Sequence, residues 1–236
     1  SGPLFVGIDL GGTNIKAALV DDHGRMVAFH TEPTHVQNGP DDAAIRMGHS
    51  VNLLAQCAGL DRSDIAAVGL GTPGPQDLST GLLIKPGNFP GWENFPVRDR
   101  VAEHCGHAVT YANDATAAAY GEFWVGSGRD DTSLILLTLG TGVGGGIIIG
   151  DMTIEGAHSH GSECGHIIVD SSPTARICPC GQPGHLEAYA SATALKAIAS
   201  ERIHDGGTGT LADAVNQGEH LTPVSYTHLT LPTIYS

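Results

Sequence analysis

Short apolar runs separated by glycine turns dominate the first part of the chain. Residues 4–9 (LFVGID) and 15–20 (IKAALV) flank a Gly-Gly turn, which predicts a strand, a tight turn and a second strand. Residues 25–33 predict a third strand. The next segment starts with acidic residues and has apolar residues at helical spacing, which predicts a helix over 41–58.

Strand and helix signals continue to alternate through the middle of the chain. An apolar stretch from residue 65 ends in a Gly/Pro loop, and residues 97–106 are compatible with a helix. A strand within 107–114 then leads into a helix that opens on Asn113 or Asp114 as its cap. Strands that alternate with helices predict an α/β fold class.

A second strand, glycine turn and strand follow at 133–139 and 143–149. One such hairpin in each half of the chain suits a two-domain fold. The uncharged run 133–150 approaches the length of a membrane span, but its six glycines favour two short buried strands instead. Past residue 151 the chain is loop-rich, and helices are expected at about 184–200 and 208–217.

Composition narrows this picture by exclusion. The 236 residues are 41% apolar, which is enough for one large core or two smaller ones. Eleven Lys and Arg against 25 Asp and Glu give a formal charge of −14, which argues against a nucleic-acid or anionic-membrane surface. The five cysteines favour a reducing compartment over a disulfide scaffold, and the N-terminus has no basic region typical of an export signal.

The two glycine turns are the first candidates for chemistry. In the first, Gly11 and Gly12 let backbone N–H groups approach a phosphate, Thr13 adds a hydroxyl, and Asp9 can hold part of a magnesium shell. An ordinary hairpin explains that turn equally well, because glycine supplies positive φ anywhere. The second turn adds three successive glycines at 144–146, which cost stability unless something must come close to them. Together the turns favour a phosphate clamp.

Further motifs follow these turns in a fixed order. They are GIDLGGTNIKAAL (7–19), PGP (73–75), GNFPGWENFPV (87–97), NDATAAAYGE (113–122), LGTGVGGG (139–146), GSECGH (161–166) and CPCGQPGHLEAYAS (178–191). Taken together they resemble the ROK family of repressors, open reading frames and kinases, within the actin and sugar-kinase superfamily. The resemblance implies an actin-like (ribonuclease H-like) two-domain ATPase fold. Residues 1–112 would form a small N-terminal domain and residues 113–223 a larger, incomplete C-terminal one.

This resemblance implies an ATP- and Mg²⁺-dependent kinase that phosphorylates the 6-hydroxyl of an aldohexose, with glucose favoured. By this resemblance Asp114, which follows Asn113, would be the general base. The position is compatible with that role, because the positive end of a helix favours an ionised carboxylate, which can accept a proton. A helix cap alone is the alternative role for Asn113 or Asp114. The phosphate and magnesium contacts would come from Asp9, Gly11, Gly12, Thr13, Gly140, Thr141 and Gly142.

Sugar hydroxyls both donate and accept hydrogen bonds, so their recognition needs several converging polar side chains. By resemblance these are Asn88, Asn113, Asp114, Glu163, His166 and Glu187. A turn residue is the alternative reading for Asn88, and a solvated loop charge is the alternative for Glu163.

The segment 178–187 carries two cysteines one residue apart. Cys178, Cys180 and His185, with His166 upstream, make four ligands suited to tetrahedral zinc. The family motif usually has a third cysteine where this chain has His185, which is also an ordinary zinc ligand. Four protein ligands leave no open position, so a structural role is expected, with His166 shared between metal and sugar. Two buried cysteines and two hydrogen-bonded histidines are the alternative.

Family members of this kind usually run to about 300 residues and include a later glycine-rich turn for the adenosine. We therefore expect a C-terminally truncated fragment, in which residues 224–236 resemble a translated sequencing adaptor and form a non-native tail. The missing adenosine side puts turnover by this chain alone in doubt, and a cut edge would expose core surface. A homodimer is an option for the full-length protein.

Three alternatives stay open. One is a kinase for N-acetylmannosamine or N-acetylglucosamine, and another is a zinc-stabilised sugar-binding module without turnover. The third is a sugar-responsive transcriptional repressor of the same family without its DNA-binding domain, which the acidic charge and early first strand disfavour. The favoured interpretation is a cytoplasmic protein whose partners are a small-molecule sugar and ATP, with neither nucleic acid nor membrane.

Overall fold

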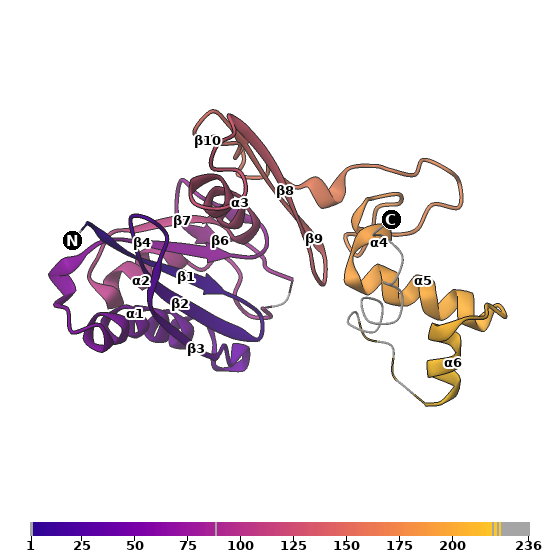
Figure 1. Ribbon diagram of the computed structural model, residues 1–236, viewed down its shortest axis with the longest axis horizontal. Helices are drawn as coiled ribbons and strands as arrows, with labels where there is room; N and C mark the ends of the chain where they lie inside the picture. Colours follow the sequence, from indigo (N-terminus) through magenta and orange to yellow (C-terminus); the bar gives the residue numbers. More distant parts are fainter. Residues whose placement is uncertain (1, 88, 219, 221, 223–236) are drawn as a thin grey trace. The chain divides into compact units, whose positions relative to one another are not determined.

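A computed structural model describes residues 2–87, 89–218, 220 and 222 of the chain (Figure 1). The chain forms two compact units, one of residues 1–136 with 146–162 and one of residues 137–145 with the chain from Glu163 onward. The predicted sugar residue Asn88 and the predicted tail 224–236 lie outside the described residues. The predicted domain boundary at 112/113 falls inside the first unit, near the end of a strand, and stays a prediction.

A five-stranded sheet forms the centre of the first unit. Its strands are β1 (Leu4–Leu10), β2 (Asn14–Asp21), β3 (Met26–Pro33), β4 (Ile65–Thr72) and β7 (Val109–Asn113), in the order β3-β2-β1-β4-β7. The two hairpin pairs are antiparallel, whereas β1–β4 and β4–β7 are parallel. Parallel neighbours need crossover connections, which α1 (Pro40–Cys57) and α2 (Val97–Cys105) provide. Short η1 (Val36–Asn38) and η2 (Arg62–Asp64) flank α1.

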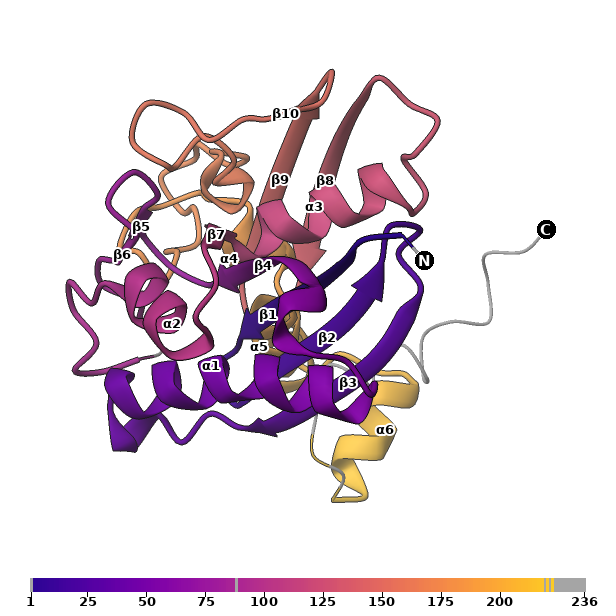
Figure 2. The ribbon, with the colours of Figure 1, turned by 90° about the vertical axis from the view of Figure 1, so that its left-hand side faces the viewer.

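Helices cover both faces of this sheet (Figure 2). Val6, Ile8 and Leu10 alternate along β1 and are buried in the core that includes the apolar faces of α1 and α2. Phe5, on the opposite face of β1, packs edge-on against Trp124 of α3 (Asp114–Trp124), with ring centroids 6.2 Å apart. The sheet therefore lies between two helical layers, which confirms the predicted α/β class.

The three parallel strands end at one edge of the sheet. β1 ends at Leu10, β4 at Thr72 and β7 at Asn113, and Thr72 pairs with Asn113 in the ladder. The first glycine turn, the Gly/Pro loop and Asp114 each follow one of these strand ends. In open α/β sheets this edge is where ligands bind.

The aromatic motif at 87–97 supports the core rather than a surface loop. Phe89 and Trp92 are 1% exposed, with ring centroids 4.8 Å apart, and Trp92 Nε1 donates to the Val36 carbonyl at 3.2 Å. The ribbon β5 (Gln76–Asp77) and β6 (Leu82–Leu83) lies between the Gly/Pro loop and this motif. These two short strands had no signal in the sequence pattern.

The second predicted hairpin is present as β8 (Ser133–Leu139) and β9 (Val143–Ile149), with β10 (Met152–Thr153) on its outer edge. A Cβ at Gly146 would run into Ala119, Ala115 and Thr116 of α3. This glycine is therefore required by the close approach of β9 to α3. The contact with α3 therefore explains Gly146 without a bound ligand, whereas the run of three glycines in the sequence favours a phosphate clamp.

The second unit contains η3 (Cys164–His166), α4 (Glu187–Ala190), α5 (Ala192–His204) and α6 (Thr210–Asn216). The helical segment predicted at about 184–200 is present, but it is divided into two helices, because Ser191 is extended (φ −70°, ψ 157°) and separates α4 from α5. Its hydroxyl accepts from the Ala194 N–H at 3.0 Å and so caps α5. In the part of the chain that the structure describes, no helix has both the length and the apolar character to span a bilayer.

Candidate functional site

The first glycine turn, Gly11 to Thr13, closes on itself and is held from one side. The Gly11 N–H donates to the Asn14 carbonyl at 2.9 Å. Buried Thr34 donates its hydroxyl to the Gly11 carbonyl at 2.5 Å and its N–H to the Thr13 carbonyl at 2.8 Å. The N–H groups of Gly12 and Thr13 have no acceptor among the described residues. Successive unpaired amides of this kind are suited to an anion.

Asp9 lies two residues before this turn and faces solvent. Its carboxylate is 3.6 Å from Lys16 Nζ on the neighbouring strand, and both side chains are about half exposed. An exposed pair of this kind contributes at most about 1 kcal/mol. The carboxylate therefore stays accessible to a cation, as its predicted magnesium role requires.

Asn113 and Asp114 lie where β7 ends and α3 begins. The Asn113 side chain accepts from the N–H groups of Ala115 at 2.9 Å and Thr116 at 3.4 Å, so Asn113 is the N-cap. Half-buried Asp114 accepts from the Ala115 N–H at 2.7 Å through Oδ1. The N–H donor and the helix dipole both favour the ionised carboxylate. The role of Asp114 as the general base stays a prediction.

A buried hydrogen bond links β4 to β7 close to the junction between β7 and α3. Thr72 Oγ1 lies 2.8 Å from the Tyr111 hydroxyl, and the two residues come from the neighbouring strands β4 and β7. Burial raises the pKa of Tyr111 to about 12. The hydrogen bond with Thr72 lowers this pKa, but its effect is smaller than that of burial. The phenol therefore stays protonated, and this polar bond joins the two strand ends near Asp114.

The second glycine turn, Gly140 to Gly142, contacts α4 and the start of α5. The Gly140 N–H donates to the Gly142 carbonyl at 3.0 Å and closes the turn. Glu187 Oε2 accepts from the Val143 N–H at 2.9 Å, and a Cβ at Gly142 would collide with the same carboxylate. A side chain at 142 would therefore displace the flexible end of Glu187 from the Val143 N–H.

The predicted sugar residues are divided between the two units. Asn113 and Asp114 belong to the first unit, whereas Glu163, His166 and Glu187 belong to the second. Glu163 is exposed just before η3, and its carbonyl accepts from the His166 N–H at 3.1 Å. One oxygen of Glu187 already bonds Val143, and the other lies 3.8 Å from Cys178 Sγ. Their role in sugar binding stays a prediction.

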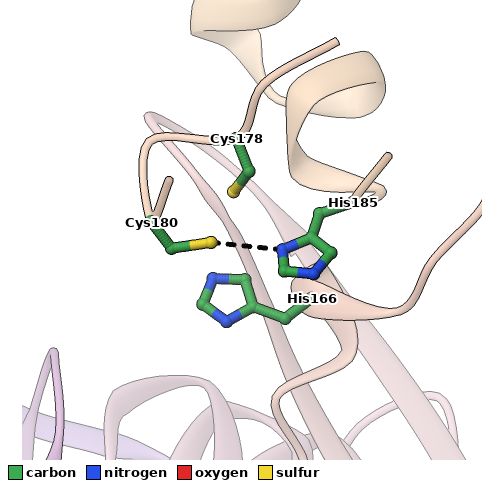
Figure 3. A group of neighbouring side chains, drawn as sticks. All are labelled: His166, Cys178, Cys180 and His185. Carbon is green, nitrogen blue, oxygen red and sulfur yellow. Dashed lines mark hydrogen bonds between the residues drawn. The ribbon is translucent and has the colours of Figure 1, made fainter. Parts of the chain in front are cut away.

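The four predicted zinc ligands converge in the second unit (Figure 3). One ligand atom from each of His166, Cys178, Cys180 and His185 lies within 4.8 Å of the others. Cys180 Sγ is 3.2 Å from His185 Nδ1, and the two imidazole rings stack with centroids 5.1 Å apart. A tetrahedral ion with bonds of about 2.0–2.3 Å needs ligand atoms about 3.3–3.8 Å apart, so shifts of about 1 Å would complete the set.

Local backbone geometry brings these ligands together. The Leu186 N–H donates to the Ile167 carbonyl at 2.9 Å and the Val169 N–H to the Gly184 carbonyl at 2.8 Å, which aligns the segments after His166 and around His185. Gly184 has φ +80°, and a side chain there would meet the Asp170 carbonyl. Two strand-like segments and one obligatory glycine therefore build the metal loop.

The protonation of the Cys178 thiol bears on metal binding, because a metal ion binds the thiolate and must displace the proton. The pKa of Cys178 is raised to about 11, chiefly by burial and to a lesser extent by the Cys180 thiol and the Glu187 carboxylate, whereas a hydrogen bond from the Cys180 backbone lowers it. The group is thus a neutral thiol near pH 7 unless a cation takes the place of its proton. Two sulfur and two imidazole donors form a set that zinc commonly takes.

Sequence reasoning missed the residues that hold the turns and the loop. Thr34 and Thr193 bond turn carbonyls, and the Tyr189 hydroxyl donates to Asp170 at 2.7 Å and accepts from the Arg176 N–H at 2.8 Å. Each contact joins residues distant in sequence or on different elements. The local pattern therefore held no signal for them.

The ROK family model matches residues 5–230. Among curated proteins, the chain is 37% identical over 197 residues to a glucokinase of Thermotoga maritima, covering 84% of this chain and 60% of that protein. It is 31% identical to an N-acetylmannosamine kinase of Haemophilus influenzae, covering 82% and 61%. The chain thus spans about three fifths of the length of the curated relatives it matches.

Three solved structures are similar to this one. A ROK hexokinase from Thermus thermophilus has a TM-score of 0.75 at 35% identity, covering 85% of this chain and 64% of that one. A ROK glucokinase from Streptomyces griseus, solved with glucose and AMPPNP, has a TM-score of 0.71 at 34% identity, covering 90% and 64%.

The third, a ROK transcriptional regulator described as a homologue of the E. coli MLC protein, has a TM-score of 0.78 at 26% identity, covering 94% and 54%. With the mixed α/β architecture, these neighbours confirm the predicted actin-like ATPase fold. They and the family match also confirm the resemblance that the motifs carried. The chain belongs to the ROK family.

Proposed function

We propose that the chain is part of an ATP-dependent sugar kinase that phosphorylates the 6-hydroxyl of an aldohexose, with glucose favoured. The observation that carries this proposal is one sheet edge in the first unit. There, β1 ends in a turn with unpaired amides, and β7 ends at an ionisable carboxylate held at a helix N-terminus. Phosphoryl transfer needs a phosphate cradle and a base near the nucleophile.

The proposed reaction uses this chain's groups in three roles. Asp114 accepts the proton of the sugar hydroxyl while the hydroxyl oxygen attacks the γ-phosphorus of ATP. The bond between the γ-phosphorus and the oxygen that bridges it to the β-phosphate breaks, and ADP leaves. Amides of the two glycine turns hold phosphate oxygens. Asp9 holds part of the shell of Mg²⁺, whose charge offsets that of the phosphates when it is bound.

Sugar recognition is proposed for Asn88, Asn113, Asp114, Glu163, His166 and Glu187. Zinc at His166, Cys178, Cys180 and His185 is proposed to be structural, because four protein ligands leave no position for a reacting water. The free cysteines suit a reducing compartment, so we place the protein in the cytoplasm.

A kinase for N-acetylmannosamine is the second candidate, because a named relative of that activity covers a similar share of the chain. A sugar-binding regulator is the third, because a ROK regulator has a TM-score of 0.78 with this structure. The regulator needs no phosphoryl transfer, so turnover separates it from both kinases.

The test is an ADP-release assay on protein expressed from the full-length gene. Glucose, mannose, fructose, N-acetylmannosamine and N-acetylglucosamine are compared at equal concentration. We expect the largest kcat/KM with glucose. Turnover confined to an N-acetyl sugar would support the second candidate, and no turnover with any sugar would reject the kinase.

A further inference from the structure

Each glycine turn has a carbonyl that a threonine hydroxyl holds from elsewhere in the same unit. Thr34, directly after β3, donates through Oγ1 to the Gly11 carbonyl at 2.5 Å. Thr193, in the first turn of α5, donates through Oγ1 to the Thr141 carbonyl at 2.9 Å. The two threonines lie on unrelated elements, one after a strand and the other at the start of a helix. Each nevertheless donates its hydroxyl to a carbonyl of a glycine turn.

Main-chain donors reinforce both contacts. The Thr34 N–H bonds the Thr13 carbonyl at 2.8 Å, and the Ala192 N–H bonds the Gly140 carbonyl at 2.9 Å. Ala192 is the first residue of α5, whose first N–H groups have no partner inside the helix. The Gly140 carbonyl therefore accepts a hydrogen bond from an otherwise unpaired N–H at the start of α5, and the same bond holds the second turn in place.

Peptide planarity converts these contacts into a direction for the neighbouring amides. In a trans peptide, the carbonyl of one residue and the N–H of the next point in opposite directions. Holding the Gly11 carbonyl turns the Gly12 N–H away from Thr34. Holding the Gly140 and Thr141 carbonyls likewise turns the N–H groups of Thr141 and Gly142 away from α5. None of these three N–H groups has an acceptor among the described residues.

The two threonines differ in what else could explain them. Thr34 is 0% exposed, so its hydroxyl needs a protein partner in any case. Thr193 is exposed and has water available, yet its hydroxyl bonds the turn carbonyl. Burial alone therefore does not account for the shared contact.

We propose that Thr34 and Thr193 are positioning residues for phosphate binding. Neither touches the ligand, and each fixes the peptide plane that aims a turn amide at it. This inference rests on the phosphate role in the proposed function. It adds one residue behind each turn whose removal weakens phosphate binding without removing any phosphate contact.

The test compares Thr→Val, which removes the hydroxyl at nearly constant shape, with Thr→Ser, which keeps it. Thr34→Val, Thr34→Ser, Thr193→Val and Thr193→Ser are made in the 236-residue chain, with Thr31→Val and Thr174→Val as controls in the same two units. Amide exchange is followed at Gly11 and Gly140, whose N–H groups close the turns. Calorimetry measures the affinity for magnesium tripolyphosphate, which carries a phosphate chain without adenosine.

We expect each Val variant to speed exchange at its own turn by about three- to tenfold and to weaken tripolyphosphate binding by a similar factor. The Ser variants and controls should stay within about twofold of wild type. Exchange that is unchanged in Thr193→Val, with α5 still folded by circular dichroism, would overturn the inference at the second turn. Thr34→Val decides the first turn in the same way, and Thr34→Ala, which also removes the hydroxyl but leaves a smaller side chain, does so if the Val variant does not fold.

The two readouts separate this inference from the proposed function. Wild-type chain that fails to bind tripolyphosphate would count against the phosphate role of the turns. In that case the exchange rates still decide whether the threonines hold them. Wild-type binding with equal affinity in both Val variants would overturn the positioning role alone.

Discussion

The two glycine turns present similar unpaired amides but depend on different parts of the molecule. The first is held by Thr34, which is buried and follows a strand of the same sheet. The second is held by Glu187 and Thr193, which come 44 and 52 residues later, one beside the metal loop and one on an exposed helix face. The first turn should therefore persist as long as the sheet is folded, whereas the second depends on the Cys/His loop.

Among the changes considered, removal of the metal should have the largest effect on the second turn and none on the first. Structural zinc in small sites contributes on the order of 10 kcal/mol to folding of the segment it binds. Without it, we expect the loop from His166 to Glu187 to open and amide exchange at Val143 to rise by at least about a hundredfold. Exchange at Gly11 should not change.

The measurement is amide exchange with and without a chelator, beside metal analysis of the purified protein. His185→Ala serves as the variant that loses one ligand, and His185→Cys as the one that restores the usual family residue. Equal exchange at Val143 with and without metal would contradict the dependence of the second turn on the loop.

Methyl groups added to the second turn should separate steric from backbone effects. In Gly142→Ala the new methyl would push the Glu187 carboxylate off the Val143 N–H, at a cost of about 1–3 kcal/mol. Gly140→Ala is the matched control, because a Cβ there has nothing within 4 Å. Urea unfolding curves should show the loss for the first variant and a change below about 0.5 kcal/mol for the second. Equal losses would show that Glu187 does not shape the turn.

Acid should weaken the second turn through the metal. The pKa of Cys178 is raised to about 11, so metal binding near neutral pH must displace its proton. Below pH 11 this proton alone should lower the apparent zinc affinity by about tenfold for each unit that the pH falls. Competition with a chromophoric chelator at pH 6.5 and 7.5 measures the change. An affinity independent of pH would remove Cys178 from the ligand set.

The local parts of the fold and site could be predicted from the sequence. Apolar alternation marked β1, β2, β8 and β9, and the polar pair at 113–114 marked the start of α3, where Asn113 is the N-cap. Ligand spacing also indicated the cluster at His166 and residues 178–185, which the structure brings together. These features depend on residues near one another in the chain, or on a motif with fixed spacing.

Features set by distant contacts could not be predicted in this way. The extended Ser191 between α4 and α5 interrupts a segment whose composition favours one helix. Gly146 is small because α3 approaches β9, and Thr34 and Thr193 matter because of the carbonyls that they meet across the fold. In each case the deciding atom belongs to a residue that a local sequence window does not contain.

The most direct test of the proposed kinase is the turnover of Asp114→Asn, in protein expressed from the full-length gene, with glucose and MgATP. The amide keeps the shape of the side chain but cannot accept the proton, so we expect kcat to fall by about 10²–10⁴-fold while glucose binding by calorimetry is retained. Asp130→Asn, an exposed carboxyl with 10% of its side chain covered, is the matched control and should keep wild-type kcat. Turnover by Asp114→Asn equal to that of the control would contradict the assignment of Asp114 as the base.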